Sequence, residues 1–128
     1  AKQLGAEITF AGGEALRAPA SDVALEPGTL MVALPEWREV ADRTVIKALD
    51  ARGMFPDGYM LPSYAALQVA AAALAAEAKG QPLAVALGEE LFDTAIGPVK
   101  FDSKGDLAEN PYRVWRFDGT RFLAVEGL

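Results

Sequence analysis

A chain of 128 residues, 52% of them hydrophobic, is long enough to bury the core of one domain and too apolar for a disordered protein. Its formal net charge is −6 and its basic residues are scattered, so nucleic acid and anionic membranes are poor partners. The absence of Cys and His removes thiol nucleophiles, disulfides, ordinary zinc sites and any Ser-His-Asp mechanism.

Strands are expected at two places in the N-terminal part of the chain. Apolar and polar residues alternate over 7–11, which predicts a strand that runs into Gly12 and Gly13. The continuous apolar run at 29–34 has the length of a buried strand and is stopped by Pro35.

Helices are predicted in the middle of the chain. Apolar residues recur at three- and four-residue steps over 36–52, which predicts one amphipathic helix with Gly53 as its C-terminal cap. The segment 63–79 is apolar on nearly every face and predicts a buried helix with Ser63 as N-cap, too rich in Ala for a membrane span. A shorter helix is expected at 82–91.

Further strands are expected at 97–101, 112–117 and 119–125. The last two are separated by Asp118-Gly119, a dipeptide that strongly favours a hairpin turn. Together with the earlier elements, these strands indicate an α/β or α+β fold without internal repeats.

The acidic stretch at 102–107 raises the question of a calcium loop. Counted from Asp102, the third and twelfth positions, which supply oxygen ligands in an EF-hand loop, are Lys104 and Arg113, and the sixth, which must be glycine, is Leu107. The Asp, Ser and Gly residues of the stretch instead predict a turn that comes after a strand. We therefore expect neither a metal nor a cofactor.

Four stretches in this order resemble one family: FAGGEAL at 10–16, GYMLPSYAALQ at 58–68, FDTAIGPVKFDSKGDL at 92–107 and YRVWRFDG at 112–119. They are similar to the C-terminal part of the type I periplasmic solute-binding proteins that serve ABC transporters, in the Leu/Ile/Val-binding branch. The resemblance covers essentially the whole chain, from Lys2 onward.

The resemblance implies a two-lobed α/β binding protein without catalytic activity, which closes around an amino acid held between its lobes. Residues 1–33 and 112–128 would belong to the C-terminal lobe and residues 34–111 to the N-terminal lobe, with crossovers near 33–36 and 108–112. It also implies a periplasmic or extracytoplasmic location, and a membrane permease of an ABC transporter as partner.

Two ligand-binding residues are implied by the same resemblance. Glu14, after the glycine pair, matches the acidic residue that accepts a hydrogen bond from the α-ammonium group of a bound amino acid. Tyr59 matches the aromatic residue that covers the ligand. From the residues alone, Glu14 is more typical of a solvated loop carboxylate. Tyr59 is equally well explained as an ordinary anchor of the helix. Arg17 departs from the family pattern, and its cation would favour an acid where Glu14 favours a free amino group.

Two other classes of function are open from the sequence. The same fold serves as a ligand-sensing domain in amino-acid receptors, and the presence of a transmembrane helix or a signalling domain after Leu128 would favour that role over transport. An enzyme would need paired carboxylates such as Glu89 with Glu90, or Asp102 with Asp106, which are more typical of a solvated face.

The chain starts at Ala1 in mid-pattern, as a trimmed or truncated chain would. Because both implied lobes are incomplete, strand edges and apolar faces should lie uncovered. We therefore expect the chain to self-associate or to pair with the missing N-terminal part of the binding protein.

Overall fold

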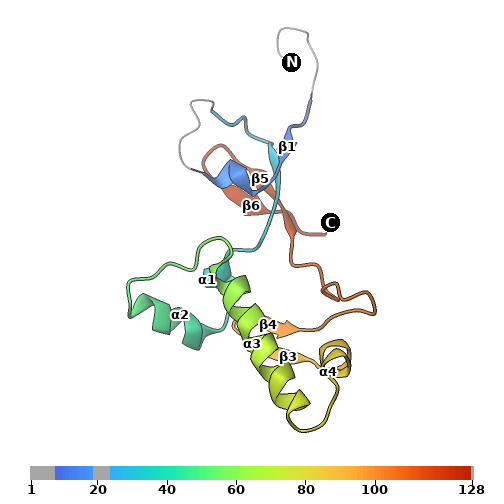
Figure 1. Cartoon of the computed structure of the whole chain (residues 1–128). Coiled ribbons are helices and arrows are strands. Elements are labelled where there is room, and N and C mark those ends of the chain that lie inside the picture. The colour runs from blue at the N-terminus through green and yellow to red at the C-terminus, as the bar shows by residue number, and fades with distance from the viewer. Residues whose placement is uncertain (1–7, 19–23, 128) are drawn as a thin grey trace. The chain divides into compact units, whose positions relative to one another are not determined.

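The computed structural model describes residues 8–18 and 24–127, and it divides the chain into two compact units. Unit 1 consists of Ala1–Pro35 with Pro111–Leu128, and unit 2 consists of Glu36–Asn110 (Figure 1). Both units combine helical segments with open sheets, so the expected mixed α/β class is confirmed. In the described part of the chain, no helix has the length and apolar character needed to cross a membrane.

Unit 1 is built on a sheet with the strand order β1-β2-β5-β6. Its strands are β1 (Ala11–Gly12), β2 (Leu30–Ala33), β5 (Arg113–Phe117) and β6 (Phe122–Ala124). β1 runs parallel to β2, whereas β2 with β5 and β5 with β6 are antiparallel. Met31 of β2 lies opposite Trp115 of β5, and both side chains are buried in the core of the unit.

The first predicted strand is shorter than the sequence suggests. Among the described residues of the segment 7–11, only Ala11 is assigned to a strand, and the predicted residue Glu7 lies outside the described part. Ile8 and Phe10 are exposed, although the backbone carbonyl of Phe10 still accepts a hydrogen bond from the amide of Leu30 at 2.8 Å. The alternating pattern therefore marks extended chain at the sheet edge.

The hairpin predicted at Asp118-Gly119 is confirmed. The carboxylate of Asp118 accepts hydrogen bonds from the amides of Thr120 at 2.7 Å and Arg121 at 2.9 Å. These N–H groups, that of Arg121 most strongly, lower the pKa of Asp118 below its ordinary value of 3.8. Gly119 has φ 109°, a left-handed conformation that favours glycine. The turn extends to Arg121, so β6 begins at Phe122 instead of 119.

Unit 2 packs helices against a short hairpin (Figure 1). Its elements are α1 (Trp37–Val40), α2 (Arg43–Asp50), α3 (Met60–Glu77), α4 (Leu83–Glu89), β3 (Phe92–Thr94) and β4 (Gly97–Val99). The core gathers one residue or more from α3, α4 and both strands: Val69, Ala73, Ala86, Phe92 and Val99. The packing of α3 against both α4 and β3 thus organises the unit.

The single helix predicted over 36–52 is wrong, because the chain forms α1 and α2 with a break between them. The side chain of Asp42 accepts hydrogen bonds from the amides of Thr44 at 2.8 Å and Val45 at 3.1 Å, so it caps a new helix. The amide of Asp42 donates to the carbonyl of Ala95 at 2.9 Å, in the turn between β3 and β4. This long-range bond holds the break in place.

The helix predicted over 63–79 exists, but two details of that prediction are wrong. It begins at Met60, one turn before the expected cap Ser63, because Pro62 in the first turn needs no intrahelical hydrogen-bond donor. The structure also buries only one face of α3, at Leu61, Ala65, Val69 and Ala73. Large side chains on the opposite face are exposed, with Leu67 at 68%.

The hairpin of β3 and β4 was only half predicted. β3 (Phe92–Thr94) is absent from the sequence-based expectations, although its burial alternates as the period of a strand requires. The hydroxyl of Thr94 donates to the carbonyl of Gly97 at 2.6 Å and closes the turn. β4 ends at Val99, two residues before the predicted 101, while Phe101 forms an isolated bridge with Leu107.

We predict that Asp42→Ala frays α2, because it removes the acceptor for two amides of the first turn. Asp42→Asn keeps an oxygen acceptor and should preserve the helix at neutral pH. Hydrogen exchange at the amides of Thr44 and Val45, measured by NMR, reports on the cap. Equal protection of both amides in the wild type and in Asp42→Ala would contradict the capping role.

The cap also gives a pH dependence. The amides of Val45 and Thr44 lower the pKa of Asp42 below 3.8. The stabilisation is therefore fully present above the unfolded-state pKa and is lost as the pH falls through the lower folded-state pKa. Asp42→Asn, which does not titrate, should lack this acid-dependent step.

Candidate functional site

Glu14 lies at the start of a short 3-10 helix in unit 1. This helix, η2 (Glu14–Arg17), comes after β1 and Gly13, and its turns are closed by hydrogen bonds from Leu16 to Gly13 at 3.1 Å and from Ala18 to Ala15 at 3.2 Å. The side chain of Glu14 is half-buried. A carboxylate on this turn, still partly open to solvent, is available for a ligand ammonium group.

The two glycines before Glu14 have different surroundings. A Cβ atom on Gly12 would lie 2.9 Å from Cδ1 of Leu16, so this glycine makes room for the leucine of η2. Leu16 in turn packs on Met31 and Trp115 in the core of unit 1. A Cβ atom on Gly13 would meet nothing within 4 Å. The open space beside the glycine pair therefore lies at Gly13 and not at Gly12.

Arg17, at the other end of η2, is engaged within its own unit. Its Nη2 donates to the carbonyl of Leu34 at 2.8 Å, and its guanidinium carbon lies 4.9 Å from the ring centroid of Trp115. The indole Nε1 of Trp115 is 3.4 Å from the carbonyl of Ala33 and donates to it. The sequence carries no signal for these contacts, because their partners lie far from Arg17 along the chain.

Tyr59 lies at the N-cap position of α3 in unit 2 and is 61% exposed. The buried residue Trp37 donates from Nε1 to the carbonyl of Gly58 at 3.0 Å, which fixes the backbone directly before Tyr59. Tyr64, which lies on the helix predicted to be buried, is exposed as well. The start of α3 therefore presents aromatic rings to solvent. Glu14 and Tyr59 belong to different units, and their joint role as a binding site stays a prediction.

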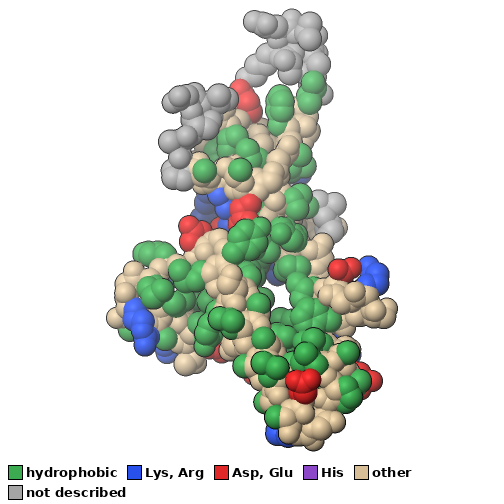
Figure 2. Space-filling model, in the orientation of Figure 1, with side chains coloured by type: hydrophobic (Ala, Val, Ile, Leu, Met, Phe, Trp, Pro, Cys, Tyr) green, Lys and Arg blue, Asp and Glu red, His purple; other side chains and the backbone are tan. Residues whose placement is uncertain are grey.

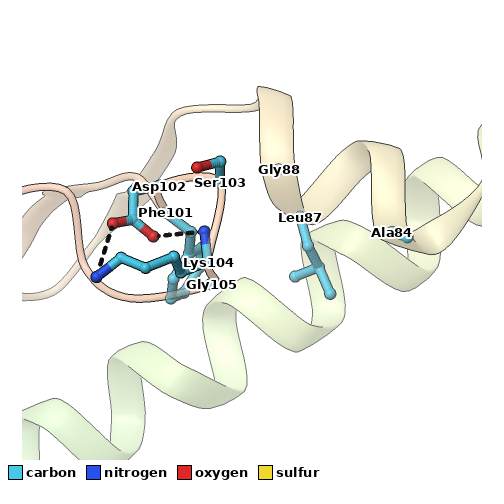
Figure 3. Close-up of a pocket in the computed structure, with 8 residues that line it drawn as sticks. All are labelled: Ala84, Leu87, Gly88, Phe101, Asp102, Ser103, Lys104 and Gly105. Carbon is cyan, nitrogen blue, oxygen red and sulfur yellow. Dashed lines mark hydrogen bonds and ion pairs between the residues drawn. The ribbon is translucent and has the colours of Figure 1, made fainter.

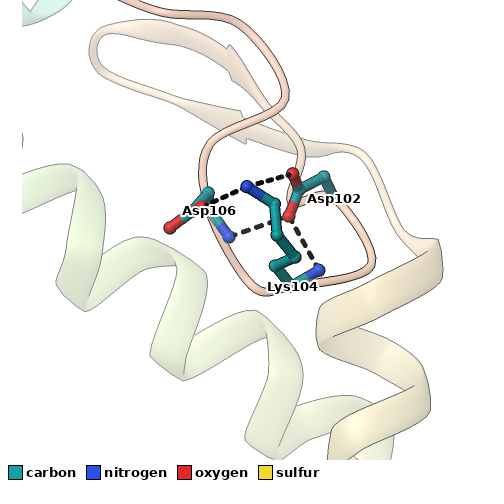
Figure 4. A network of polar contacts seen from close by, with 3 residues as sticks. All are labelled: Asp102, Lys104 and Asp106. Carbon is teal, nitrogen blue, oxygen red and sulfur yellow. Dashed lines mark hydrogen bonds and ion pairs between the residues drawn. The ribbon is translucent and has the colours of Figure 1, made fainter.

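The acidic stretch at 102–107 forms the predicted turn. The Oδ1 atom of Asp102 accepts hydrogen bonds from the amides of Lys104 at 2.8 Å and Asp106 at 3.0 Å (Figure 4). The ammonium group of Lys104 lies 2.9 Å from the carboxylate of Asp106 and 3.8 Å from that of Asp102. The two carboxylates thus share a cation supplied by the chain itself.

A shallow hollow of about 370 Å³ lies between this turn and α4 (Figure 3). Leu87 and Phe101 supply apolar side chains, and the polar lining comes from Asp102, Ser103 and Lys104. The carboxylate of Asp102 is already committed to the backbone of its own turn. Within the described ranges, 8–18 and 24–127, His, Cys, Asp and Glu nowhere form a group of three or more that could hold a metal ion.

The fold gives the architecture of the chain: it crosses twice between two α/β units, and unit 1 presents the carboxylate of Glu14 on a short turn after a strand. A carboxylate placed in this way is available to a small ligand. No family model matches the chain.

Comparison with known proteins identifies relatives of the chain. The chain is 33% identical over 130 residues to the leucine-, isoleucine-, valine-, threonine- and alanine-binding protein of Pseudomonas aeruginosa, with 94% of this chain and 35% of that protein covered. It is 34% identical over 102 residues to the leucine-specific-binding protein of Salmonella typhimurium, covering 74% of this chain and 28% of that protein. An amino acid binding protein of Pseudomonas aeruginosa is 34% identical over 94 residues, covering 71% and 25%.

The chain is therefore homologous to part of these amino acid binding proteins, which agrees with the resemblance of its motifs to the Leu/Ile/Val-binding branch of the type I periplasmic solute-binding proteins. It spans about a third of the length of the relatives it matches. Its two units are accordingly a partial version of the two-lobed fold.

Proposed function

We propose that the chain is part of an extracytoplasmic binding protein that captures a branched-chain or other apolar amino acid by lobe closure. The complete protein would deliver this ligand to the membrane permease of an ABC transporter. The observation that carries the proposal is the match of 94% of the chain to a protein named for binding leucine, isoleucine, valine, threonine and alanine. The relatives are binding proteins, which favours capture of a ligand over catalysis.

Glu14 and Tyr59 would supply two different parts of ligand recognition. The carboxylate of Glu14 would accept a hydrogen bond from the α-ammonium group, a charge-assisted contact that strengthens when water is excluded. The ring of Tyr59, exposed at the start of α3, would cover the apolar ligand. The half-buried position of Glu14 beside the open space at Gly13 supports its role, since a ligand can approach there.

We predict that the isolated chain of 128 residues binds leucine or valine weakly or not at all. It spans only 35% of the Pseudomonas relative, so most of the contacts that would surround a ligand in a closed protein are missing. Isothermal titration calorimetry with each amino acid measures this directly. Micromolar affinity of the isolated chain would contradict the prediction.

A chimera tests the role of Glu14. When residues 1–128 replace the matched segment of the Pseudomonas relative, we expect leucine binding, and Glu14→Gln should weaken it by roughly 10- to 100-fold, the range for losing a charged hydrogen bond. Glu89→Gln, which removes an exposed carboxylate on α4, is the matched control and should leave the affinity unchanged. Equal leucine affinity in the Glu14→Gln and Glu89→Gln chimeras would remove Glu14 from the site.

An uncovered helix face supports the proposal that the chain pairs with further protein. We call this face the outer stripe of α3; it consists of Met60, Tyr64, Leu67, Ala71 and Leu74, all exposed. The spacing of four, three, four and three residues aligns these side chains along one face of the helix. Figure 2 shows hydrophobic side chains gathered over this helix. In the complete binding protein, the part that this chain does not span would cover the stripe.

Without that covering part, we predict that the chain self-associates through the outer stripe of α3. Leu67→Glu should shift the chain towards monomer in sedimentation velocity, because it places a charge where an apolar contact is needed. Leu91→Glu is the matched control, since Leu91 is a leucine of the same unit with 66% exposure against 68% for Leu67. A compact monomer for the unmodified chain at all concentrations would contradict this prediction.

A further inference from the structure

We infer that Arg17 is a positioning residue: its guanidinium group fixes the short helix that presents Glu14, and it does not serve as the cation that meets the ligand's carboxylate. The functional part of this inference rests on the proposed ligand role of Glu14. It also assigns a role to the residue at which the chain departs from the pattern of its family.

Two contacts of the guanidinium group are made with residues that are themselves buried. Nη2 donates to the carbonyl of Leu34 at 2.8 Å, and the guanidinium carbon lies 4.9 Å from the ring centroid of Trp115. Leu34 is 4% exposed and Trp115 is 6% exposed. A planar guanidinium can donate in its plane and stack on an aromatic ring with its face, which a lysine ammonium cannot do.

The two contacts of Arg17 affect the position of Glu14 because both residues belong to η2. A 3-10 helix has three residues per turn, so the first and last residues of Glu14–Arg17 lie one turn apart, roughly 6 Å along the axis. Leu16 anchors the middle of the same turn in the core. A helix this short has little hydrogen bonding of its own, so its orientation depends on Leu16 and Arg17.

The partners Trp115 and Leu34 belong to the sheet of unit 1 and to the backbone that leaves this sheet. Trp115 lies in the centre of β5, opposite Met31, and Leu34 comes directly after β2 near the end of the first segment of unit 1. Arg17 thus ties the turn that carries Glu14 to the backbone that leads out of the unit. A ligand that engages Glu14 would contact a turn that Arg17 joins to this exit.

The assignment bears on the contacts that a ligand can make at this turn. If Arg17 were directed at a ligand, it would favour an additional acidic group on that ligand. Its Nη2 donates instead to the carbonyl of Leu34, and its guanidinium carbon lies over the ring of Trp115, so both contacts direct the side chain into its own unit.

The test compares Arg17→Ala, Arg17→Lys and the control Arg116→Ala in the 128-residue chain. Arg116 is an exposed arginine on β5 of the same unit. Hydrogen exchange is followed at the amides of Leu16 and Ala18, which close η2, and at Phe117, which bonds to Thr29 in the sheet region. Arg17→Ala should accelerate exchange at the η2 amides by about tenfold, the loss expected for one hydrogen bond with a cation–π contact, and leave Phe117 unchanged.

A second readout reports on the carboxylate itself. The ¹³C chemical shift of the Glu14 carboxyl carbon at neutral pH should change in Arg17→Ala and stay at the wild-type value in Arg116→Ala. Arg17→Lys keeps the charge and a donor, so it should restore both readouts in part. Wild-type exchange at Leu16 and Ala18 together with an unchanged Glu14 shift in Arg17→Ala would overturn the inference.

The experiment still tests the positioning role of Arg17 if Arg17→Ala destabilises the whole of unit 1. If Arg17→Ala exposes Phe117 to exchange as well, Arg17→Lys decides: selective recovery of the η2 amides supports positioning, and parallel recovery of all three amides overturns it. Neither readout involves a ligand. Failure of the ligand role of Glu14, seen in the chimera titration, is therefore distinguishable from failure of the positioning role of Arg17.

Discussion

The pairing of β2 with β5 is the interaction on which the rest of the structure depends. It places Met31 opposite Trp115 and Ala33 opposite Arg113, across the whole of unit 2 in the sequence. Closing so long a loop costs entropy, and the buried Met31 and Trp115 side chains and the ladder of hydrogen bonds must offset that cost. The same pairing also brings together the two points at which the chain leaves unit 1 for unit 2 and returns from it.

Elements that depend on local pattern were predictable from the sequence. The apolar run of β2, the Asp-Gly turn before β6 and the long apolar helix all appear where the residues indicate. The prediction of one helix over 36–52 failed because a distant group contributes to the local structure there. Asp42 starts a new helix in a segment with unbroken helical periodicity, and its amide is held by the carbonyl of Ala95, far away in the sequence.

The candidate site shows the same division between local and distant information. Glu14 and Tyr59 were found by matching motifs, and their chemistry alone did not separate a ligand residue from a solvated side chain. The role of Arg17 was out of reach of the sequence, since an arginine near a glycine pair reads as a cation available to a ligand. Only the fold brings Trp115 and the carbonyl of Leu34 to its guanidinium group. A partner this far along the chain leaves no periodicity or spacing to recognise.

The composition of α3 suits a helix that is covered by protein on both of its faces. A helix with one solvated face normally carries charged residues there, yet between Met60 and Glu77 the only charged residue is Glu77 itself. The inner face uses Ala65 and Ala73 to approach its neighbours closely, and the outer stripe repeats this combination of alanine with larger apolar side chains. Small residues on both faces suit a helix packed between two surfaces. Unit 2 supplies one of these surfaces, and the exposed outer stripe of α3 has the apolar composition that a second packing surface would need.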